Sequence, residues 1–587
     1  MAAPQRSKSS DSNTALIIML AAIAAAAAVW AGAAIAAVVN GYSPPRFGVE
    51  SILRIVSKPA DPEAAWGQEM PPAALSWSST ALVLAATAGV GYLGWRLLGQ
   101  RQRDDVRHLP GTATAAQIRH AASARALLKR GRHLRPSITH PQADDVGHKL
   151  GHARGIAVYT SCEDSTVVLG PPRSGKGLHI VVGKILDATG AVITTSTRPD
   201  NLTITLKARA RTGPVAVFDP QQLAAGVERG LKWSPVRGCQ HAQTAMIRAR
   251  GLASSMGMNS NGGVDDANYW QGQTEAVLRG LLHAAALDGR NAHDLYRWSL
   301  DPVRASEAVR VMHNSSRAAP GWADALDAIV AMDDRTRSNI WSGVRQSLAA
   351  LADPRVLDAV TPHERDQFDP ESFVNERGSL YLLGTSTGAG AAASLVNAFI
   401  EDMLETVRRV AARSPGARLD PPLSLVLDEI GNLSPLPSLP SLMSEGGGSG
   451  INTTAVLQSL AQARGAWGDQ QAGTIWDAAI VKLVLGGGSN ARDLQDLSAL
   501  IGERDEETIS TSRGNDGSRS SSTNLRRIPI MDGGRLRTLP FGTAVLLLRS
   551  APPIILDMQQ WTRRLDAEQL RRDRAELEAA IGAYARR

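Results

Sequence analysis

The stretch Thr166-Val-Val-Leu-Gly170-Pro-Pro-Arg-Ser-Gly175-Lys176-Gly177-Leu-His-Ile-Val-Val182 organises the chain, because it reads as a buried strand, a glycine-framed turn and the start of a helix. The glycines let the backbone wrap closely with its N–H groups pointing inward, and the helix that begins near Lys176 adds the positive end of its dipole. The Lys176 ammonium can then reach the outer phosphates of a triphosphate. The sequence therefore predicts a phosphate-binding loop formed by Gly170, Pro171, Pro172, Arg173, Ser174, Gly175, Lys176 and Gly177.

The last position of this loop departs from the full motif. G-x-x-x-x-G-K-[ST] ends in a hydroxyl residue that holds Mg²⁺, whereas this chain has Gly177. One metal ligand is therefore missing from the loop. The alternative interpretation is a chance glycine-rich turn between a strand and a helix, and a second motif decides between the two.

The second motif is the apolar strand Leu423-Ser-Leu-Val-Leu, which ends in Asp428 and Glu429. In P-loop enzymes an Asp at such a strand end orients Mg²⁺, and a following Glu can act as base on the attacking water. We therefore predict that Asp428 is the metal ligand and Glu429 the catalytic base. A strand that ends in Asp-Glu is common, but together with the loop it indicates an ATPase that uses ATP and Mg²⁺.

A fourth candidate catalytic residue is Gln458, which follows an expected strand at residues 453–457. Neighbouring strands of a parallel sheet end at the same edge, so the Gln458 amide should lie beside the γ-phosphate. A neutral amide can accept from the attacking water and donate to a phosphate oxygen. The alternative is a cap for the next helix, although Gln is a poor N-cap and Ser459 would serve better.

Two uncharged apolar runs precede these motifs, at residues 14–39 and 70–95. Both exceed the roughly 20 residues that cross a bilayer, and Trp77 and Trp95 stand near the ends of the second run, where aromatic rings favour the interface. We therefore expect two transmembrane helices in the cell membrane. For the first run, a buried Ala-rich helix of a soluble protein is the alternative.

The charge around these runs gives their orientation. Residues 96–135 hold ten Lys and Arg against two acids, a local excess larger than the net charge of +7 of the whole chain. By the positive-inside rule both termini are cytoplasmic. The basic segment suits lipid headgroups and nucleic acid equally well. The two cysteines, Cys162 and Cys239, have no partners at ligand spacing, which excludes a disulfide framework and a cysteine-based zinc site.

The order of strands and helices gives the fold class. Alternating strand and helix patterns from residue 165 onward predict an α/β fold with a parallel sheet covered on both faces. Residues 240–352 show helical periods without strands and read as an all-helical insertion. Residues 503–524 read as a charged, Ser-rich mobile loop, and the tail as a charged helix that faces solvent or a partner. The expected strands lie at residues 165–169, 191–195, 215–218, 379–384, 424–427, 453–457, 479–485 and 543–549.

These observations divide the chain into five parts. We expect a membrane anchor at 1–98 with its two helices, a basic cytoplasmic connector at 99–164, a nucleotide-binding domain at 165–239 and 353–565, an all-α insertion domain at 240–352, and a charged C-terminal helix at 566–587.

Several segments together resemble the conjugative coupling proteins of type IV secretion, the TraD/TraG family, in its actinobacterial form with a TraM-recognition-like region. They are the two apolar runs, the loop at 170–177, Thr195-Ser-Thr-Arg-Pro-Asp-Asn201, Phe218-Asp-Pro220, Trp233-Ser-Pro-Val-Arg-Gly238, Leu427-Asp-Glu-Ile-Gly-Asn432 and Val456-Leu-Gln-Ser-Leu-Ala-Gln462.

The resemblance implies a RecA-like P-loop NTPase domain with an inserted all-α domain, preceded by two transmembrane helices. It further implies that Gly177 is a familiar form of the loop, that the Mg²⁺ site rests on Asp428 and water, and that Gln458 senses the γ-phosphate. Relatives often carry a trans-acting arginine before this strand, whereas here residues 444–450 contain none. Such an arginine either comes from elsewhere, with Arg464 and Arg492 as candidates, or is absent.

The function that follows is a membrane-anchored ATPase that assembles as a homo-hexamer. It would recruit the relaxase–DNA complex with its accessory DNA-processing proteins and drive single-stranded DNA toward the channel components of type IV secretion. Two alternatives remain. One is an FtsK-like translocase of double-stranded DNA, and the other is a membrane docking receptor that does not hydrolyse ATP.

Overall fold

The structure, a computed structural model, describes the backbone of residues 9–48, 50, 54, 57–227, 230–254, 264–363, 366, 368–385, 392–433, 435–513 and 519–586. Within these ranges the side chains of residues 9–22, 91, 93–104, 264–268, 509–513 and 519–520 are not described. The chain divides into two compact units, residues 1–108 and 109–587.

The first unit contains two long helices, α1 (Ser9–Val39) and α4 (Ala73–Asp104), with the short α3 (Pro62–Trp66) between them. The long helices pack on each other so closely that a Cβ at Gly32 would lie 2.4 Å from Thr80 Cα. Among the described residues, Ala73–Val90 is long and apolar enough to cross a membrane, and Ile23–Val39 is a shorter apolar helix. The first expected span is therefore not established, because the side chains of residues 14–22 lie outside the described part.

The second unit is built on one large mixed sheet, in the order β2-β1-β13-β12-β9-β3-β8-β7-β4-β6-β5. The strands from β9 to β5 run parallel, and the four at the other edge are antiparallel to their neighbours. The α/β fold class is thus as expected. The strands span β1 Gly147–Ala153, β2 Ile156–Ser161, β3 Thr166–Leu169, β4 Val192–Ser196, β5 Val215–Phe218, β6 Ser379–Leu383, β7 Leu423–Leu427, β8 Ile451–Leu457, β9 Val481–Leu485, β12 Thr543–Leu548 and β13 Ile554–Met558.

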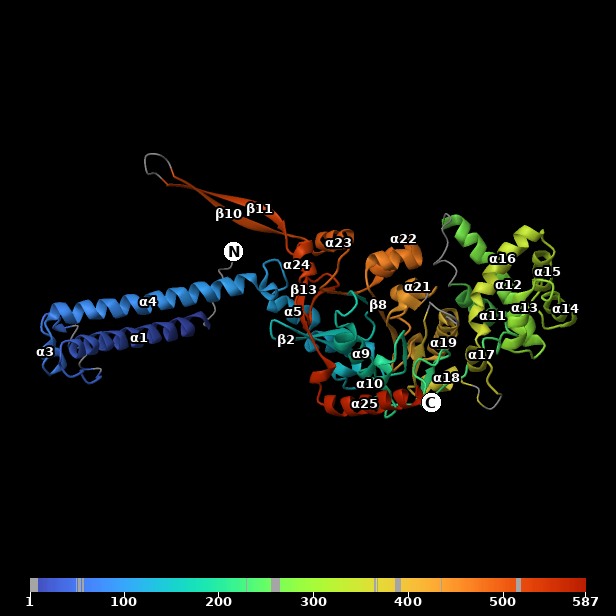
Figure 1. The fold of residues 1–587 in the computed structure, drawn as a ribbon, viewed down its shortest axis with the longest axis horizontal. Coiled ribbons are helices and arrows are strands. Elements are labelled where there is room, and N and C mark those ends of the chain that lie inside the picture. The colour runs from blue at the N-terminus through green and yellow to red at the C-terminus, as the bar shows by residue number, and fades with distance from the viewer. Residues whose placement is uncertain are drawn as a thin grey trace. The chain divides into compact units, whose positions relative to one another are not determined.

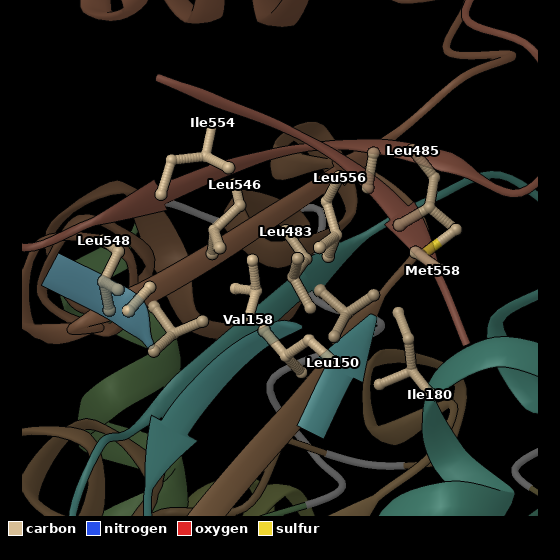
Figure 2. Close-up of a cluster of buried hydrophobic side chains, with 14 of the residues drawn as sticks. Leu150, Val158, Ile180, Leu483, Leu485, Leu546, Leu548, Ile554, Leu556 and Met558 are labelled. Carbon is tan, nitrogen blue, oxygen red and sulfur yellow. The ribbon is translucent and has the colours of Figure 1, made fainter. Parts of the chain in front are cut away.

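The interior of the sheet explains why its parallel strands read as continuous apolar runs. Each residue of β3, β4, β5, β6 and β8 is buried, as expected where helices cover both faces. Figure 2 shows the core at the antiparallel edge, where Leu150, Val158, Leu483, Leu546 and Leu556 pack together. Burying apolar surface of this kind stabilises the fold by roughly 25 cal/mol per Å².

Helices surround this sheet, and a group of them lies between β5 and β6 in sequence. Figure 1 shows α11 to α17 gathered at one end of the unit. The helices of the second unit span α5 Ala115–Ala122, α6 Ala124–Leu128, α7 Gly131–Leu134, α8 Ala143–Val146, α9 Val182–Leu186, α10 Asp200–Arg209, α11 Ala242–Ala253, α12 Val264–Leu287, α13 Ala292–Leu300, α14 Ser306–Asn314, α15 Trp322–Val330, α16 Asp334–Ser347, α17 Pro354–Ala359, α18 Pro370–Asn375, α19 Ala393–Arg413, α20 Ile430–Leu433, α21 Leu439–Glu445, α22 Leu460–Ala478, α23 Ala491–Ile501, α24 Gly533–Arg537 and α25 Ala567–Tyr584.

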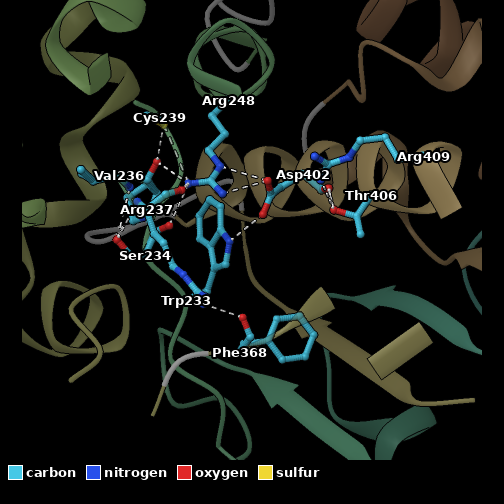
Figure 3. Close-up of polar contacts among 11 residues, drawn as sticks. Trp233, Ser234, Val236, Arg237, Cys239, Arg248, Phe368, Asp402, Thr406 and Arg409 are labelled. Atoms are coloured by element: carbon cyan, nitrogen blue, oxygen red, sulfur yellow. Dashed lines mark hydrogen bonds and ion pairs between the residues drawn. The ribbon is translucent and has the colours of Figure 1, made fainter. Parts of the chain in front are cut away.

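A buried ion pair joins the first helix of this group to α19, which follows β6. Arg248 of α11 donates to Asp402 Oδ1 from Nη2 at 2.9 Å and from Nε at 3.1 Å, and Trp233 Nε1 donates to Oδ2 of the same carboxylate at 3.2 Å (Figure 3). Because such a pair is costly to break once buried, these contacts fix the base of the helical group against α19.

The prediction of a mobile loop at residues 503–524 is wrong. The chain forms the antiparallel ribbon β10 (Glu503–Arg513) and β11 (Arg519–Pro529), which extends away from the sheet in Figure 1. Asp505 lies opposite Arg527, and Glu506 opposite Arg526. Such opposite-charge pairs support a ribbon in which none of the described side chains is buried. Few apolar residues therefore did not mean an absence of regular structure.

Two further expectations need correction. The stretch at 147–161, which lies within the expected polar connector 99–164, forms β1 and β2 and joins the large sheet through β13. The C-terminal helix α25 exists, but it is docked rather than solvated, because Leu570 and Leu577 are buried beside residues of α10 such as Ile204 and Leu206. Its sparse apolar positions are enough to cover α10.

Candidate active site

The loop after β3 has the conformation that its glycines predict. Gly175 has a φ of +87°, and a Cβ there would lie 2.8 Å from His179, so no other residue fits without strain. The chain then enters a π-helical turn at Gly177–Val181 and continues into α9. Such turns are frequent at functional sites. The Ser174 hydroxyl is buried without a hydrogen-bond partner among the described residues.

Lys176 folds back over its own loop. Its Nζ donates to the carbonyl oxygens of Gly170 at 2.7 Å and Pro171 at 2.9 Å. Burial lowers the pKa of Lys176, and the nearby carboxylates Asp428 and Glu429 oppose that shift. The ammonium therefore already stands inside the loop, where it could exchange two carbonyl partners for phosphate oxygens.

Asp428 and Glu429 follow β7, and the structure brings both near Lys176. Burial raises the pKa of Asp428 to about 6, the Asn201 hydrogen bond and Lys176 oppose this rise, and Glu429 adds to it. Glu429 has a positive φ of 52° and accepts a hydrogen bond from the Thr197 hydroxyl, so its carboxylate is held in one orientation.

Gln458 lies at the end of β8, between β3 and β7 in the sheet. The register pairs Leu457 with Leu169 and Ala455 with Leu427. Gln458 is therefore level with Gly170, and along the strand direction it lies beyond Asp428. It lines a cavity of about 460 Å³. The residues around that cavity are Leu169, Gly170, Pro171, Pro172, Gln458, Ser459, Leu460, Val484, Leu485, Gly488, Ser489, Asn490, Asp493, Leu494 and Leu497.

The next helix takes its cap from the neighbouring residues. Ser459 accepts from the backbone N–H of Gln462 at 3.0 Å, and the Gln462 side chain accepts from the backbone N–H of Gln458 at 2.9 Å. Ser459 is therefore the N-cap of α22, and the Gln462 side chain satisfies the backbone N–H of the residue before the cap. Among the residues that the structure describes, no hydrogen bond involves the Gln458 amide, so capping does not explain its presence.

The candidate arginines differ in their surroundings. Arg464 is paired with Asp493 at 2.5 Å, and that carboxylate is itself buried on α23. Arg492 is exposed on the same helix. Within the described part of the chain, Arg492 is the one of the two that has no buried ion-pair partner.

Residues at the end of β4 complete the site, and the sequence reasoning assigned them no role. Thr195 donates to the Asp428 backbone oxygen at 2.9 Å, Thr197 donates to Glu429, and Asn201 donates to Asp428 Oδ2 at 2.8 Å. β4 is the neighbour of β7 in the sheet. These residues lie at the same sheet edge as Asp428 because β4 pairs with β7, and the sequence pattern alone does not give that strand order.

Comparisons with known proteins agree with this architecture. The family model described as type IV secretory system conjugative DNA transfer matches residues 115–580. No curated protein sequence matches the chain.

Among solved structures, the bacterial conjugative coupling protein TrwB in its unbound form is 17% identical, with a TM-score of 0.50 over 71% of this chain and 90% of that one. TrwB in complex with ADP and Mg²⁺ is 18% identical, with a TM-score of 0.50 over 71% and 92%. TrwB with a non-hydrolysable ATP analogue is 17% identical, with a TM-score of 0.51 over 71% and 91%. At this identity the likeness concerns the fold.

Proposed function

Because the chain belongs to the type IV secretory system conjugative DNA transfer family, we propose that it is a membrane-anchored ATPase that recruits the relaxase–DNA complex and drives single-stranded DNA toward the transfer channel. The observation that carries the ATPase part is the meeting of Lys176, Asp428 and Glu429 at one edge of the sheet. That TrwB has been solved with ADP and Mg²⁺ supports ATP and Mg²⁺ as ligands of this chain.

The residues fit the proposed chemistry in type and in position. Asp428 and Asn201 present oxygen atoms at this edge, and Mg²⁺ prefers oxygen ligands. Mg²⁺, when bound with ATP, supplies positive charge that stabilises the phosphoryl oxygens. Lys176 would leave its two carbonyls for the phosphates. Glu429, held by Thr197, would accept the proton of the attacking water, and Gln458 would orient that water.

The remaining parts of the proposal concern assembly. Residues 170–177 cradle the triphosphate. Residues 240–352 form an insertion domain within the nucleotide-binding domain of residues 165–239 and 353–565. Six copies of the chain form a ring. Relaxase, accessory DNA-processing proteins and channel components are its protein partners. A trans-acting arginine, for which Arg492 is the exposed candidate, would couple neighbouring subunits. Analytical ultracentrifugation with an ATP analogue tests the ring, which a persistent monomer would exclude.

We expect the unit 109–587 to hydrolyse ATP, and single-stranded DNA to raise the rate. The measurement is phosphate release with no DNA, with single-stranded DNA and with double-stranded DNA. The matched control is Glu429→Gln, which keeps the shape of the side chain and removes the proposed base. Stronger stimulation by double-stranded DNA would favour the FtsK-like translocase, and nucleotide binding without hydrolysis would favour the docking receptor.

We further propose that residues 1–98 anchor the protein with helices at 14–39 and 70–95, both termini being cytoplasmic. The basic excess of residues 96–135 supports this orientation. A reporter that is active only outside the cytoplasm should be active when fused at Glu63 of α3 and inactive when fused after residue 108. An inactive fusion at Glu63, with the protein present in the membrane fraction, would contradict two crossings.

A further inference from the structure

Gly177 leaves an open place next to the phosphate loop, and one side chain from elsewhere in the fold faces it. A Cβ built on Gly177 would lie 3.5 Å from Asn201 Oδ1, the one atom outside the local helix backbone within 4 Å among the described residues. Asn201 belongs to the start of α10, just after β4, and is only 5% exposed. The amide oxygen thus lies next to the position from which a Ser or Thr at residue 177 would carry its hydroxyl.

The orientation of this amide follows from its other contact. Asn201 Nδ2 donates to Asp428 Oδ2 at 2.8 Å. The NH₂ group is the donor end of the amide, and a carboxylate oxygen accepts from it. The NH₂ group of Asn201 therefore faces Asp428, and its carbonyl oxygen lies on the side of Gly177.

The backbone holds Asn201 in this place. The backbone carbonyl oxygen of Asn201 accepts a hydrogen bond from the Thr205 hydroxyl at 2.7 Å. That hydroxyl also contacts the buried Tyr381 hydroxyl at 2.7 Å. Tyr381 lies on β6, the neighbour of β4 in the sheet. The contacts through Thr205 and Tyr381 thus hold the backbone of Asn201, and Asp428 holds its side-chain amide.

We propose that Asn201 supplies the metal-facing oxygen that Gly177 lacks, so that Asn201 Oδ1 and Asp428 together hold the Mg²⁺ of the bound nucleotide, directly or through a metal-bound water. Amide oxygens are ordinary ligands of hard divalent cations. The inference rests on the proposed nucleotide site and adds to it the residue that replaces the usual Ser or Thr.

The test measures binding rather than turnover. The full chain in detergent is titrated with a fluorescent non-hydrolysable ATP analogue, with Mg²⁺ and with EDTA. Asn201→Ala should lower the affinity in Mg²⁺ by about 10- to 100-fold, the range for residues that support a metal, and leave the affinity in EDTA unchanged. Asn397→Ala is the control, because it truncates another buried Asn, on α19, that hydrogen-bonds Ser254.

A second change to the same site makes the test sharper. In Gly177→Ser/Asn201→Ala the new hydroxyl points into the space that the amide vacated, and most of the lost Mg²⁺ dependence should return. Asn201→Asp keeps an oxygen at this position and should keep the Mg²⁺ dependence even where Asn201→Ala folds poorly. Both results are specific to a metal-facing oxygen.

The outcomes separate this inference from the proposed function. If Asn201→Ala keeps the Mg²⁺ dependence of the parent, or if Asn201→Ala and Asn201→Asp both lose affinity equally in Mg²⁺ and in EDTA, Asn201 does not serve the metal while the nucleotide site stands. If the parent itself does not bind the analogue, the proposed function fails and this inference fails with it.

Discussion

Replacing Lys176 by Ala should abolish ATP hydrolysis, with a loss on the order of 10²–10³-fold or more, as for other preorganised groups that stabilise developing charge. The ammonium is the one positive charge of the loop that already stands against the carbonyls of Gly170 and Pro171, and both carboxylates, Asp428 and Glu429, act on it. Without it, the negative phosphates would meet these carboxylates uncompensated. A 10³-fold loss corresponds to about 4 kcal/mol.

The fold should survive this change. Lys176→Ala removes two hydrogen bonds to loop carbonyls but also removes a partly buried charge, so we expect the free energy of unfolding to change by only about 1 kcal/mol. Thermal unfolding without nucleotide checks this. Lys207→Ala on α10, which breaks the surface pair with Glu576, is the matched control and should hydrolyse ATP at the parental rate. Equal hydrolysis by Lys176→Ala and the parent would remove the assignment of the loop.

The parallel half of the sheet could be predicted from the sequence because burial on both faces produces unbroken apolar runs. The strands at Thr166–Leu169 and Leu423–Leu427 each end in the residues that carry chemistry, so the loop and Asp428 followed from the same pattern. The structure places them on either side of β8, at one edge. The local pattern therefore predicted which strand ends carry the chemistry, and the order of the strands that brings these ends together comes from the structure.

The antiparallel parts could not be predicted in this way. β1 contains Gly147, Gly151 and two histidines and shows no alternation of apolar and polar residues. Its pairing with β13 joins segments about 400 residues apart in sequence, and only the folded structure shows this pairing. The ribbon β10–β11 is stabilised by cross-strand charge pairs that appear only once the register is known. Asn201 was missed for a related reason, since its role depends on β4 lying beside β7.

The Gln458→Ala variant tests whether Gln458 couples ATP hydrolysis to DNA. The register places Gln458 level with Gly170, Ser459 provides the cap of α22, and the Gln458 amide lines the cavity beside the loop. An amide in this place can accept from the attacking water and donate to a phosphate oxygen, and it can change partners when the phosphate leaves without changing its charge. The residue is therefore suited to report the presence of the γ-phosphate.

We expect Gln458→Ala to bind ATP with near-parental affinity and to lose hydrolysis by about a hundredfold, a cost of about 3 kcal/mol in the transition state, together with its stimulation by DNA. The binding measurement uses the non-hydrolysable analogue, and hydrolysis is followed with and without single-stranded DNA. Gln470→Ala, an exposed glutamine of the same helix α22, should behave as the parent. Parental DNA-stimulated hydrolysis in Gln458→Ala would return this residue to a structural role, and the loop and Asp428 would then have to couple to DNA through another group.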